Sequence, residues 1–261
     1  MKEKLLLFKP KHPAQFKKSS WYGVVMFVKT FALCSQYLAR ALAGKVNVPI
    51  TDNYLRRFWQ IQFKETFSTL FVTGRKFLKP NHTYLFMSNH ESWLDIPAMF
   101  AAVPMSLRMV SKAGIMSIPV VGPAMEKAGF IAVDRKNRSK AIRQLELAKK
   151  RLNDGISIWM APEGTRSRTG EIAHFKKGGF HLATSLGLDI VPVFIEGARD
   201  IMPADTLMIN SNRSMTVHFC EPVSTKGVDK SSMNDLMEKV RTAIILKKQQ
   251  VKAIHDDESA L

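Results

Sequence analysis

The chain has 261 residues, of which 46% are hydrophobic and 23% charged, and its formal net charge at pH 7 is +17. This length suffices for one substantial core, so we expect one globular domain with an N-terminal appendage. The two cysteines, Cys34 and Cys220, exclude a disulfide framework and lie too far apart in sequence for a paired metal or redox site. The positive charge predicts a surface that attracts lipid headgroups, phosphorylated substrates, acidic carrier proteins or nucleic acid.

The N-terminal region is basic and then apolar. Residues 1–20 contain six lysines and one glutamate, which favours a basic arm beside a membrane, or a solvated tail, over a folded element. Residues 21–43 are apolar enough to cross a bilayer core of about 30 Å as a helix. At about 100° per residue, however, Lys29, Gln36 and Arg40 form one narrow polar stripe, which favours lying in the interface. Crossing stays open as the alternative.

A second amphipathic helix is predicted from Tyr54 to Val72. Joined to the first through Gly44 and Pro49, it would form a helical hairpin. This hairpin either dips into lipid or packs on the core of the domain. We therefore divide the chain into residues 1–72, a basic arm with amphipathic membrane-associated helices, and residues 73–261, an α/β domain.

Beyond residue 80, short apolar runs alternate with helical segments, and this alternation predicts an α/β fold with a mixed, largely parallel sheet flanked by helices. The predicted strands are Tyr84 to Ser88, Leu107 to Ser111, Phe130 to Asp134, Ile156 to Met160, Ile190 to Ile195 and Met215 to Phe219. The predicted helices are Asp95 to Ala102, Asn137 to Asn153, Gly178 to Leu186 and Ser231 to Val251, with a frayed end after His255.

His90 and Asp95 are the candidate acid/base pair. They follow an apolar strand, where an open α/β sheet presents its site residues. In one continuous helix they would lie about 140° apart, so contact requires His90 in the strand-to-helix turn and Asp95 in the first helical turn. Asp95 could then accept one imidazole N–H and leave the other nitrogen as a base for a hydroxyl. The alternative is that Asp95 merely caps a helix.

A second polar block, residues 161–168, follows the strand ending at Met160 and places a glycine beside arginine, threonine and serine. Such a turn suits a phosphate, because arginine matches phosphate oxygens and glycine lets the backbone approach closely. An ordinary polar turn is the alternative.

Four blocks in this order resemble the glycerolipid acyltransferase superfamily, and most closely the bacterial 1-acylglycerol-3-phosphate acyltransferases. The blocks are Asn89-His90 with Asp95, Gly129 to Arg135, Pro162 to Ser167, and Val191-Pro192-Val193. Ala132 and Ala161 depart from the usual pattern, which puts acyl-chain or headgroup preference in question more than the chemistry.

The resemblance implies a role for each site residue. His90 would be the general base and Asp95 its orienting partner. The residues implied to bind the acceptor's glycerol phosphate are Lys112, Arg135, Glu163, Gly164, Thr165 and Arg166. Val191 and Pro192 would shape the acyl-donor side. We also expect the Gly164 N–H to donate to the oxyanion.

The implied function is transfer of an acyl group from acyl-CoA or acyl-carrier protein to the sn-2 hydroxyl of lysophosphatidic acid, without metal or cofactor. Another lysophospholipid, a lyso-aminolipid or glycerol 3-phosphate is the alternative acceptor. We expect an anionic membrane surface as partner, at the cytoplasmic face of the inner membrane, and no nucleic acid.

Other classes fit less well. The sequence has no Walker loop, dinucleotide fingerprint or Gly-x-Ser-x-Gly nucleophile elbow, and Leu94 stands where a zinc motif beginning at His90 needs a second histidine. A non-catalytic basic module that binds nucleic acid or membrane is the alternative of a different class. It predicts interleaved aromatic and basic residues or a DNA-reading helix, and the sequence shows neither.

Overall fold

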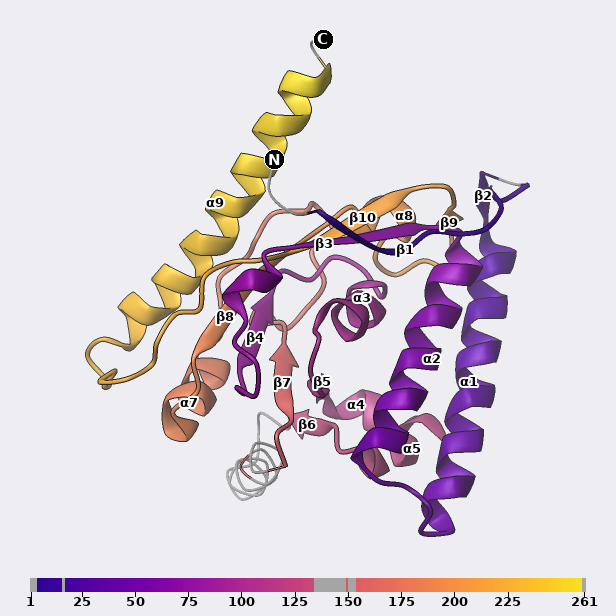
Figure 1. Ribbon diagram of the computed structural model, residues 1–261, viewed down its shortest axis with the longest axis horizontal. Coiled ribbons are helices and arrows are strands. Elements are labelled where there is room, and N and C mark those ends of the chain that lie inside the picture. Colours follow the sequence, from indigo (N-terminus) through magenta and orange to yellow (C-terminus); the bar gives the residue numbers. More distant parts are fainter. Residues whose placement is uncertain (1–3, 16, 134–148, 150–153, 260–261) are drawn as a thin grey trace.

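The computed structural model describes residues 4–15, 17–133, 149 and 154–259. Its centre is an eight-stranded sheet with the order β1-β3-β10-β8-β4-β7-β5-β6 (Figure 1), and a separate two-stranded sheet pairs β2 with β9. The strands are β1 (Leu5–Phe8), β2 (Lys18–Ser19), β3 (Thr69–Thr73), β4 (Leu85–Ser88), β5 (Leu107–Lys112), β6 (Ile131–Val133), β7 (Ser157–Met160), β8 (Ile190–Glu196), β9 (Ile209–Asn210) and β10 (Ser214–Phe219).

The middle of the large sheet is parallel. Strand β4 pairs in parallel with β7 and β8, and β5 pairs in parallel with β7 and β6. Strand β10 runs antiparallel to β8 and β1 runs antiparallel to β3. The predicted mixed, largely parallel sheet is therefore confirmed. The carboxyl ends of β8, β4, β7, β5 and β6 share one edge, where α/β sheets carry their sites.

Helices cover both faces of the sheet. The helices are α1 (Ser20–Leu42), α2 (Val48–Thr66), α3 (Asp95–Ala102), α4 (Ala113–Met116), α5 (Val121–Lys127), α7 (Lys177–Leu186), α8 (Ala198–Ile201) and α9 (Met233–Ser259), with a 3-10 turn at Arg75–Phe77. Side chains alternate between the faces along each strand. Phe86 of β4 therefore joins the core beneath α2 and α3, whereas Leu85 and Met87 join the core beneath α7 and α9.

Helices α1 and α2 form an N-terminal hairpin, and α2 packs on the domain. Lys29 of α1 pairs with Glu65 of α2 at 2.6 Å. Gln62 of α2 accepts the indole N–H of Trp93 at 3.2 Å, and Asp52 pairs with Arg108 of β5 at 2.7 Å. Of the two alternatives left open for the hairpin, these contacts favour packing of the second helix on the core.

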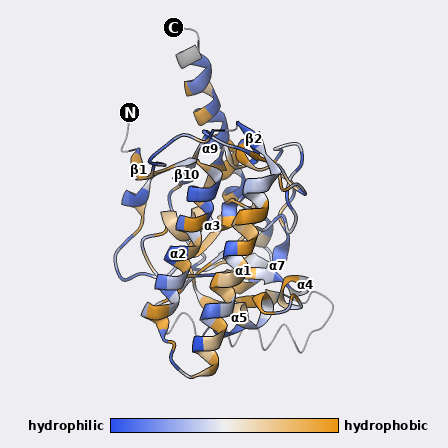
Figure 2. Ribbon diagram, turned by 90° about the vertical axis from the view of Figure 1, so that its right-hand side faces the viewer, coloured by the Kyte–Doolittle hydropathy of each residue, from blue (hydrophilic) through white to orange (hydrophobic). Residues whose placement is uncertain are grey.

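Helix α1 is largely apolar along its length (Figure 2), although the polar side chains of Lys29, Gln36 and Arg40 are exposed on it. It is long and apolar enough to cross a membrane, and 28% of its most apolar stretch is buried within the protein. The large apolar side chains exposed on it are Trp21, Val24, Val28, Phe31 and Leu42.

The predicted extent of the second helix was wrong. Helix α2 ends at Thr66, Phe67 adopts a left-handed conformation with φ of 51°, and residues 69–73 form β3 instead of continuing the helix. Buried Leu70 continues the helical spacing of Phe63 and Phe67, but Leu70 and Val72 alternate as in a strand, and the β-branched residues favour the strand. The proposed boundary between residues 72 and 73 thus falls inside β3.

The expectation that residues 1–20 form no folded element was also wrong. Strand β1 pairs with β3 at the edge of the large sheet, and β2 pairs with β9. The lysines of this region flank the apolar run Leu5–Phe8, so its average composition hid a strand. At the other end of the chain, α9 continues to Ser259, past the predicted frayed end. Apart from Lys149, the helix predicted from Asn137 to Asn153 lies outside the described residues.

Candidate active site

The turn after β4 is fixed by the side chain of Asn89, whose amide makes hydrogen bonds to the backbone of β8. Asn89 follows the last residue of β4 and is almost fully buried. Its Oδ1 accepts the backbone N–H of Ile195 at 2.7 Å, and its Nδ2 donates to the Ile195 carbonyl at 2.9 Å. The amide therefore extends the pairing of β4 with β8 by one step, and it sets the direction in which the chain leaves the sheet at His90.

His90 lies in the strand-to-helix turn and Asp95 is the first residue of α3, as the spacing required. The imidazole Nδ1 is 2.7 Å from Asp95 Oδ2. The same oxygen accepts the backbone N–H groups of Glu91 and Ser92 at 2.8 and 2.9 Å. Because Asp95 is only 1% exposed, these donors hold its carboxylate in place without help from water.

The geometry leaves the second imidazole nitrogen available. An ionised Asp95 can only accept, so Nδ1 donates and Nε2 carries the lone pair. Nε2 makes no hydrogen bond with any residue that the structure describes, and the histidine side chain is 19% exposed. The ring packs edge-to-face against Trp159, whose indole N–H donates to Ser88 Oγ at 3.0 Å. The pair can therefore take a proton from a bound hydroxyl.

The loop after β7 holds the backbone of His90. Glu163 Oε1 accepts the His90 N–H at 3.0 Å, and Oε2 accepts the Ala173 N–H at 2.9 Å. Ser167 donates its backbone N–H to the His90 carbonyl at 2.7 Å. Burial raises the pKa of Glu163, and the two backbone donors only partly oppose this shift. Both oxygens of Glu163 are engaged with the protein, so the role of this side chain in binding glycerol phosphate stays a prediction.

The expectation that Gly164 donates to an oxyanion stays a prediction, because its N–H is engaged within the protein in this conformation. Its backbone adopts φ of 75°, and its N–H donates to the Ala161 carbonyl at 3.1 Å. The tight turn that requires glycine therefore also uses the donor that we expected to be free. Thr165 follows in an exposed position.

Two of the other residues implied to bind phosphate, Arg166 and Lys112, lie at or beyond the ends of strands that share one edge of the sheet. Arg166 pairs with Asp205 at 2.7 Å, so a phosphate would have to share or displace this partner. Lys112 ends β5 and is exposed at the shared edge of the sheet. Arg135 lies outside the described residues.

Val191 and Pro192 are buried within β8. Val191 lies opposite Phe86 of β4 and Pro192 lies opposite Met87. In this conformation neither side chain is exposed to a donor, so an effect on the acyl-donor side would act through packing beneath the site and stays a prediction.

Glu91 was not singled out from the sequence. Its Oε1 accepts from Asn89 Nδ2 at 3.1 Å, and its Oε2 lies 4.0 Å from Arg199 Nε. Burial, and next the charge of Asp95, raise the pKa of Glu91 to about 7. The sequence offered only the position of Glu91 beside His90, because burial and the distant Arg199 are set by the fold.

Within the described part of the chain, no group of three or more His, Cys, Asp and Glu side chains could hold a metal ion. The chemistry that the described residues offer is proton transfer at His90.

Comparison with known proteins identifies the family. Residues 69–196 match the family model described as Acyltransferase. The chain is 30% identical over 175 residues to a 1-acyl-sn-glycerol-3-phosphate acyltransferase alpha of Mus musculus, which covers 67% of this chain and 61% of that protein. It is 28% identical over 224 residues to a chloroplast 1-acyl-sn-glycerol-3-phosphate acyltransferase of Arabidopsis thaliana, covering 82% and 63% of the two chains.

The chain belongs to the glycerolipid acyltransferase superfamily. It spans about three fifths of the length of these curated relatives. The crystal structure of the 1-acyl-sn-glycerophosphate acyltransferase of Thermotoga maritima matches 90% of this chain and 95% of its own, with a TM-score of 0.73 and 22% identity. The predicted membership of the superfamily and the predicted fold class are therefore confirmed.

Proposed function

We propose that this acyltransferase moves a fatty acyl group from an acyl thioester, acyl-CoA or acyl-carrier protein, to the sn-2 hydroxyl of lysophosphatidic acid. The observation that carries the proposal is the 2.7 Å contact of His90 Nδ1 with Asp95 Oδ2, which leaves Nε2 free to act as a base. The relatives named 1-acyl-sn-glycerol-3-phosphate acyltransferases support the choice of acceptor.

In the proposed reaction, Nε2 of His90 takes the hydroxyl proton as the hydroxyl oxygen attacks the thioester carbonyl. The negative charge of Asp95 stabilises the imidazolium that forms. The new C–O bond forms, the C–S bond breaks, and the leaving thiolate receives the proton from Nε2. This route needs no nucleophile from the protein.

Cationic groups would bind the acceptor's phosphate beside this base. Lys112 ends β5 at the same edge of the sheet as His90. With Arg135 and Arg166, it would hold the phosphate so that the neighbouring hydroxyl meets Nε2, which lowers the entropic part of the barrier.

The proposed place of action is a membrane surface, at the cytoplasmic face of the inner membrane. The exposed apolar side chains of α1 and the net charge of +17 suit an anionic bilayer.

The test is transfer of labelled acyl groups, from acyl-CoA and from acyl-carrier protein, to a panel of lysolipids by protein in detergent or vesicles. Wild type should form phosphatidic acid and His90→Ala should not. The panel includes lysophosphatidic acid, a lysophospholipid with a larger headgroup, a lyso-aminolipid and glycerol 3-phosphate.

If wild type transfers acyl groups only to an acceptor other than lysophosphatidic acid, the proposed mechanism stands and the proposed substrate is wrong. No transfer by folded wild type to any acceptor from either donor would overturn the proposal in favour of a non-catalytic basic module. His82→Ala is the matched control, because His82 is an exposed histidine before β4 and should leave transfer unchanged.

A further inference from the structure

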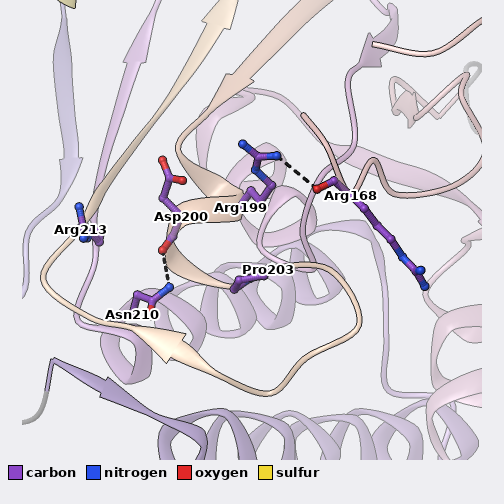
Figure 3. A pocket seen from close by; sticks show the side chains of 6 residues that line it. All are labelled: Arg168, Arg199, Asp200, Pro203, Asn210 and Arg213. Atoms are coloured by element: carbon purple, nitrogen blue, oxygen red, sulfur yellow. Dashed lines mark hydrogen bonds between the residues drawn. The ribbon is translucent and has the colours of Figure 1, made fainter. Parts of the chain in front are cut away.

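An open cavity of about 410 Å³ lies beside the candidate active site. Residues from the loop after β7, from α8 and its following turn, and from β9 and the turn before β10 surround it. They are Arg168, Arg199, Asp200, Pro203, Asn210 and Arg213. Figure 3 shows Arg213 on one side of the cavity and Arg199 on the other, with Asp200 between them.

Two guanidinium groups are available to an anion in this cavity. Arg213 makes no hydrogen bond or ion pair through its side chain with any part of the chain that the structure describes, and it is exposed. Arg199 Nη1 donates to the Arg168 carbonyl at a long 3.3 Å. The guanidinium of Arg168 itself is bound to Asp205 at 2.7 Å. Among the described residues that line the cavity, Arg199 and Arg213 outnumber the carboxylate of Asp200, and Glu91, which lies 4.0 Å from Arg199, is outside this lining.

Glycine makes room for Arg199. A Cβ at Gly170, whose φ is 86°, would lie 3.0 Å from Arg199 Nη1. The other contact of this arginine is Glu91, the residue after His90, whose Oε2 lies 4.0 Å from Arg199 Nε. Arg199, in the wall of the cavity, thus lies beside the residue that follows the proposed base in the sequence.

The opposite wall of the cavity continues into the N-terminal end of α1. Asn210 pairs with Lys18 across the β2–β9 sheet, and Ser211 donates its backbone N–H to the Lys17 carbonyl at 3.0 Å. The carbonyl of Leu207 approaches Gly23 so closely that a Cβ there would lie 2.1 Å from it. The segment before Asn210 therefore packs against the start of α1.

Exposed apolar side chains lie where the segment before Asn210 packs against the start of α1. Trp21 is 69% exposed and Leu207 is 45% exposed. Tryptophan beside lysine and arginine is the composition of a surface that sits at the headgroup level of a membrane.

We propose that Arg199 and Arg213 bind the phosphate of an anionic lipid in the membrane on which α1 rests. The inference rests on the proposed function, since it assumes a protein that works on lipids at a bilayer surface. A lipid held there would lie between the apolar face of α1 and His90, on the opposite side of the base from Lys112. The cavity is therefore a site where an anionic lipid enters or leaves.

The experiment measures binding of the full chain to phosphatidylcholine vesicles with and without phosphatidic acid, in the absence of acyl donor. Arg213→Gln should weaken binding to the phosphatidic acid vesicles about fivefold, while binding to pure phosphatidylcholine changes little. Arg213→Lys keeps the charge but not the planar fork, so it should also weaken binding. Lys230→Gln removes one charge from the exposed loop before α9, which lies on the other side of the molecule from α8 and β9 in Figure 1, and should change little.

Equal losses for Arg213→Gln and Lys230→Gln, or full binding by Arg213→Lys, would show a diffuse attraction and overturn the proposal. Unchanged vesicle binding with a raised KM for acyl-CoA would overturn it as well, and would assign the cavity to the donor's phosphates. Because vesicle binding needs no turnover, a wild type that binds but transfers nothing would refute the acyl-transfer function and leave the lipid site standing.

Discussion

The backbone N–H of His90 donates to Glu163 Oε1 at 3.0 Å, so a carboxylate joins the turn after β4 to the loop after β7. Glu163 is 3% exposed, and its second oxygen accepts the Ala173 N–H. Two polar blocks that are 73 positions apart are thereby held in one rigid arrangement around the proposed base.

Glu163→Gln should lower kcat about 10- to 100-fold and leave the KM for lysophosphatidic acid nearly unchanged. A glutamine offers one acceptor and one donor, so it cannot accept both backbone N–H groups, and His90 loses its fixed position. Steady-state kinetics measure both constants. Glu171→Gln, on an exposed residue of the same loop, is the control. A raised KM with unchanged kcat would instead support direct binding of the acceptor by Glu163.

Asp95→Asn should lower kcat about 10²- to 10⁴-fold, because the neutral amide cannot stabilise the imidazolium that forms at His90. Asp95 Oδ1 is buried with no hydrogen-bond partner among the described residues, so the amide can place its N–H₂ group there without breaking the three contacts of Oδ2. Circular dichroism should show a folded variant. A loss of less than about tenfold would argue against the role of the pair in proton transfer.

The sequence predicted the parts of this site that depend on local order. The spacing of His90 and Asp95 required a turn followed by a first helical turn, and the structure has both. It could not predict which N–H and C=O groups were already engaged. Gly164 was expected to donate to an oxyanion, yet its N–H closes the turn on Ala161.

The fold was predictable where both faces of a strand are buried. Strands β4, β7 and β8 are continuous apolar runs, which the sequence displays directly. Strand β3 was missed because a strand beginning three residues after a helix continues the helical pattern of apolar residues. Glu91 and Arg199 were missed because their meeting depends on the path of the chain through β8 and α8.

The stability of the protein should depend on the pH through Glu91. Its pKa is about 7 in the folded protein, against an ordinary value of 4.5, because burial and Asp95 disfavour the charged form. The folded state is therefore favoured while Glu91 is protonated. This contribution is complete below pH 4.5 and is lost as the pH rises to about 7, at a cost of about 3 kcal/mol.

Glu91→Gln removes this titration. Relative to wild type, its free energy of unfolding should increase by up to about 3 kcal/mol between pH 4.5 and pH 8. Urea unfolding at the two pH values measures the difference, and groups that titrate identically in both proteins cancel. If the difference in free energy of unfolding between the two proteins does not change with pH, the Glu91 carboxyl has the same pKa in the folded and unfolded states.

The attachment of α2 to the domain should depend on one ion pair, in which Arg108 is buried and Asp52 is partly exposed. Arg108 is 1% exposed, and it pairs with Asp52 of α2 at 2.7 Å while its Nε donates to the Ala128 carbonyl. Asp52→Ala leaves the buried guanidinium without its carboxylate, so the free energy of unfolding should fall by about 3 kcal/mol. The double variant Asp52→Ala with Arg108→Met removes both charges and should be more stable than Asp52→Ala alone. Urea unfolding compares the two with Asp256→Ala, an exposed control. If Asp52→Ala and Asp256→Ala unfold at the same midpoint, this pair does not hold the hairpin to the sheet.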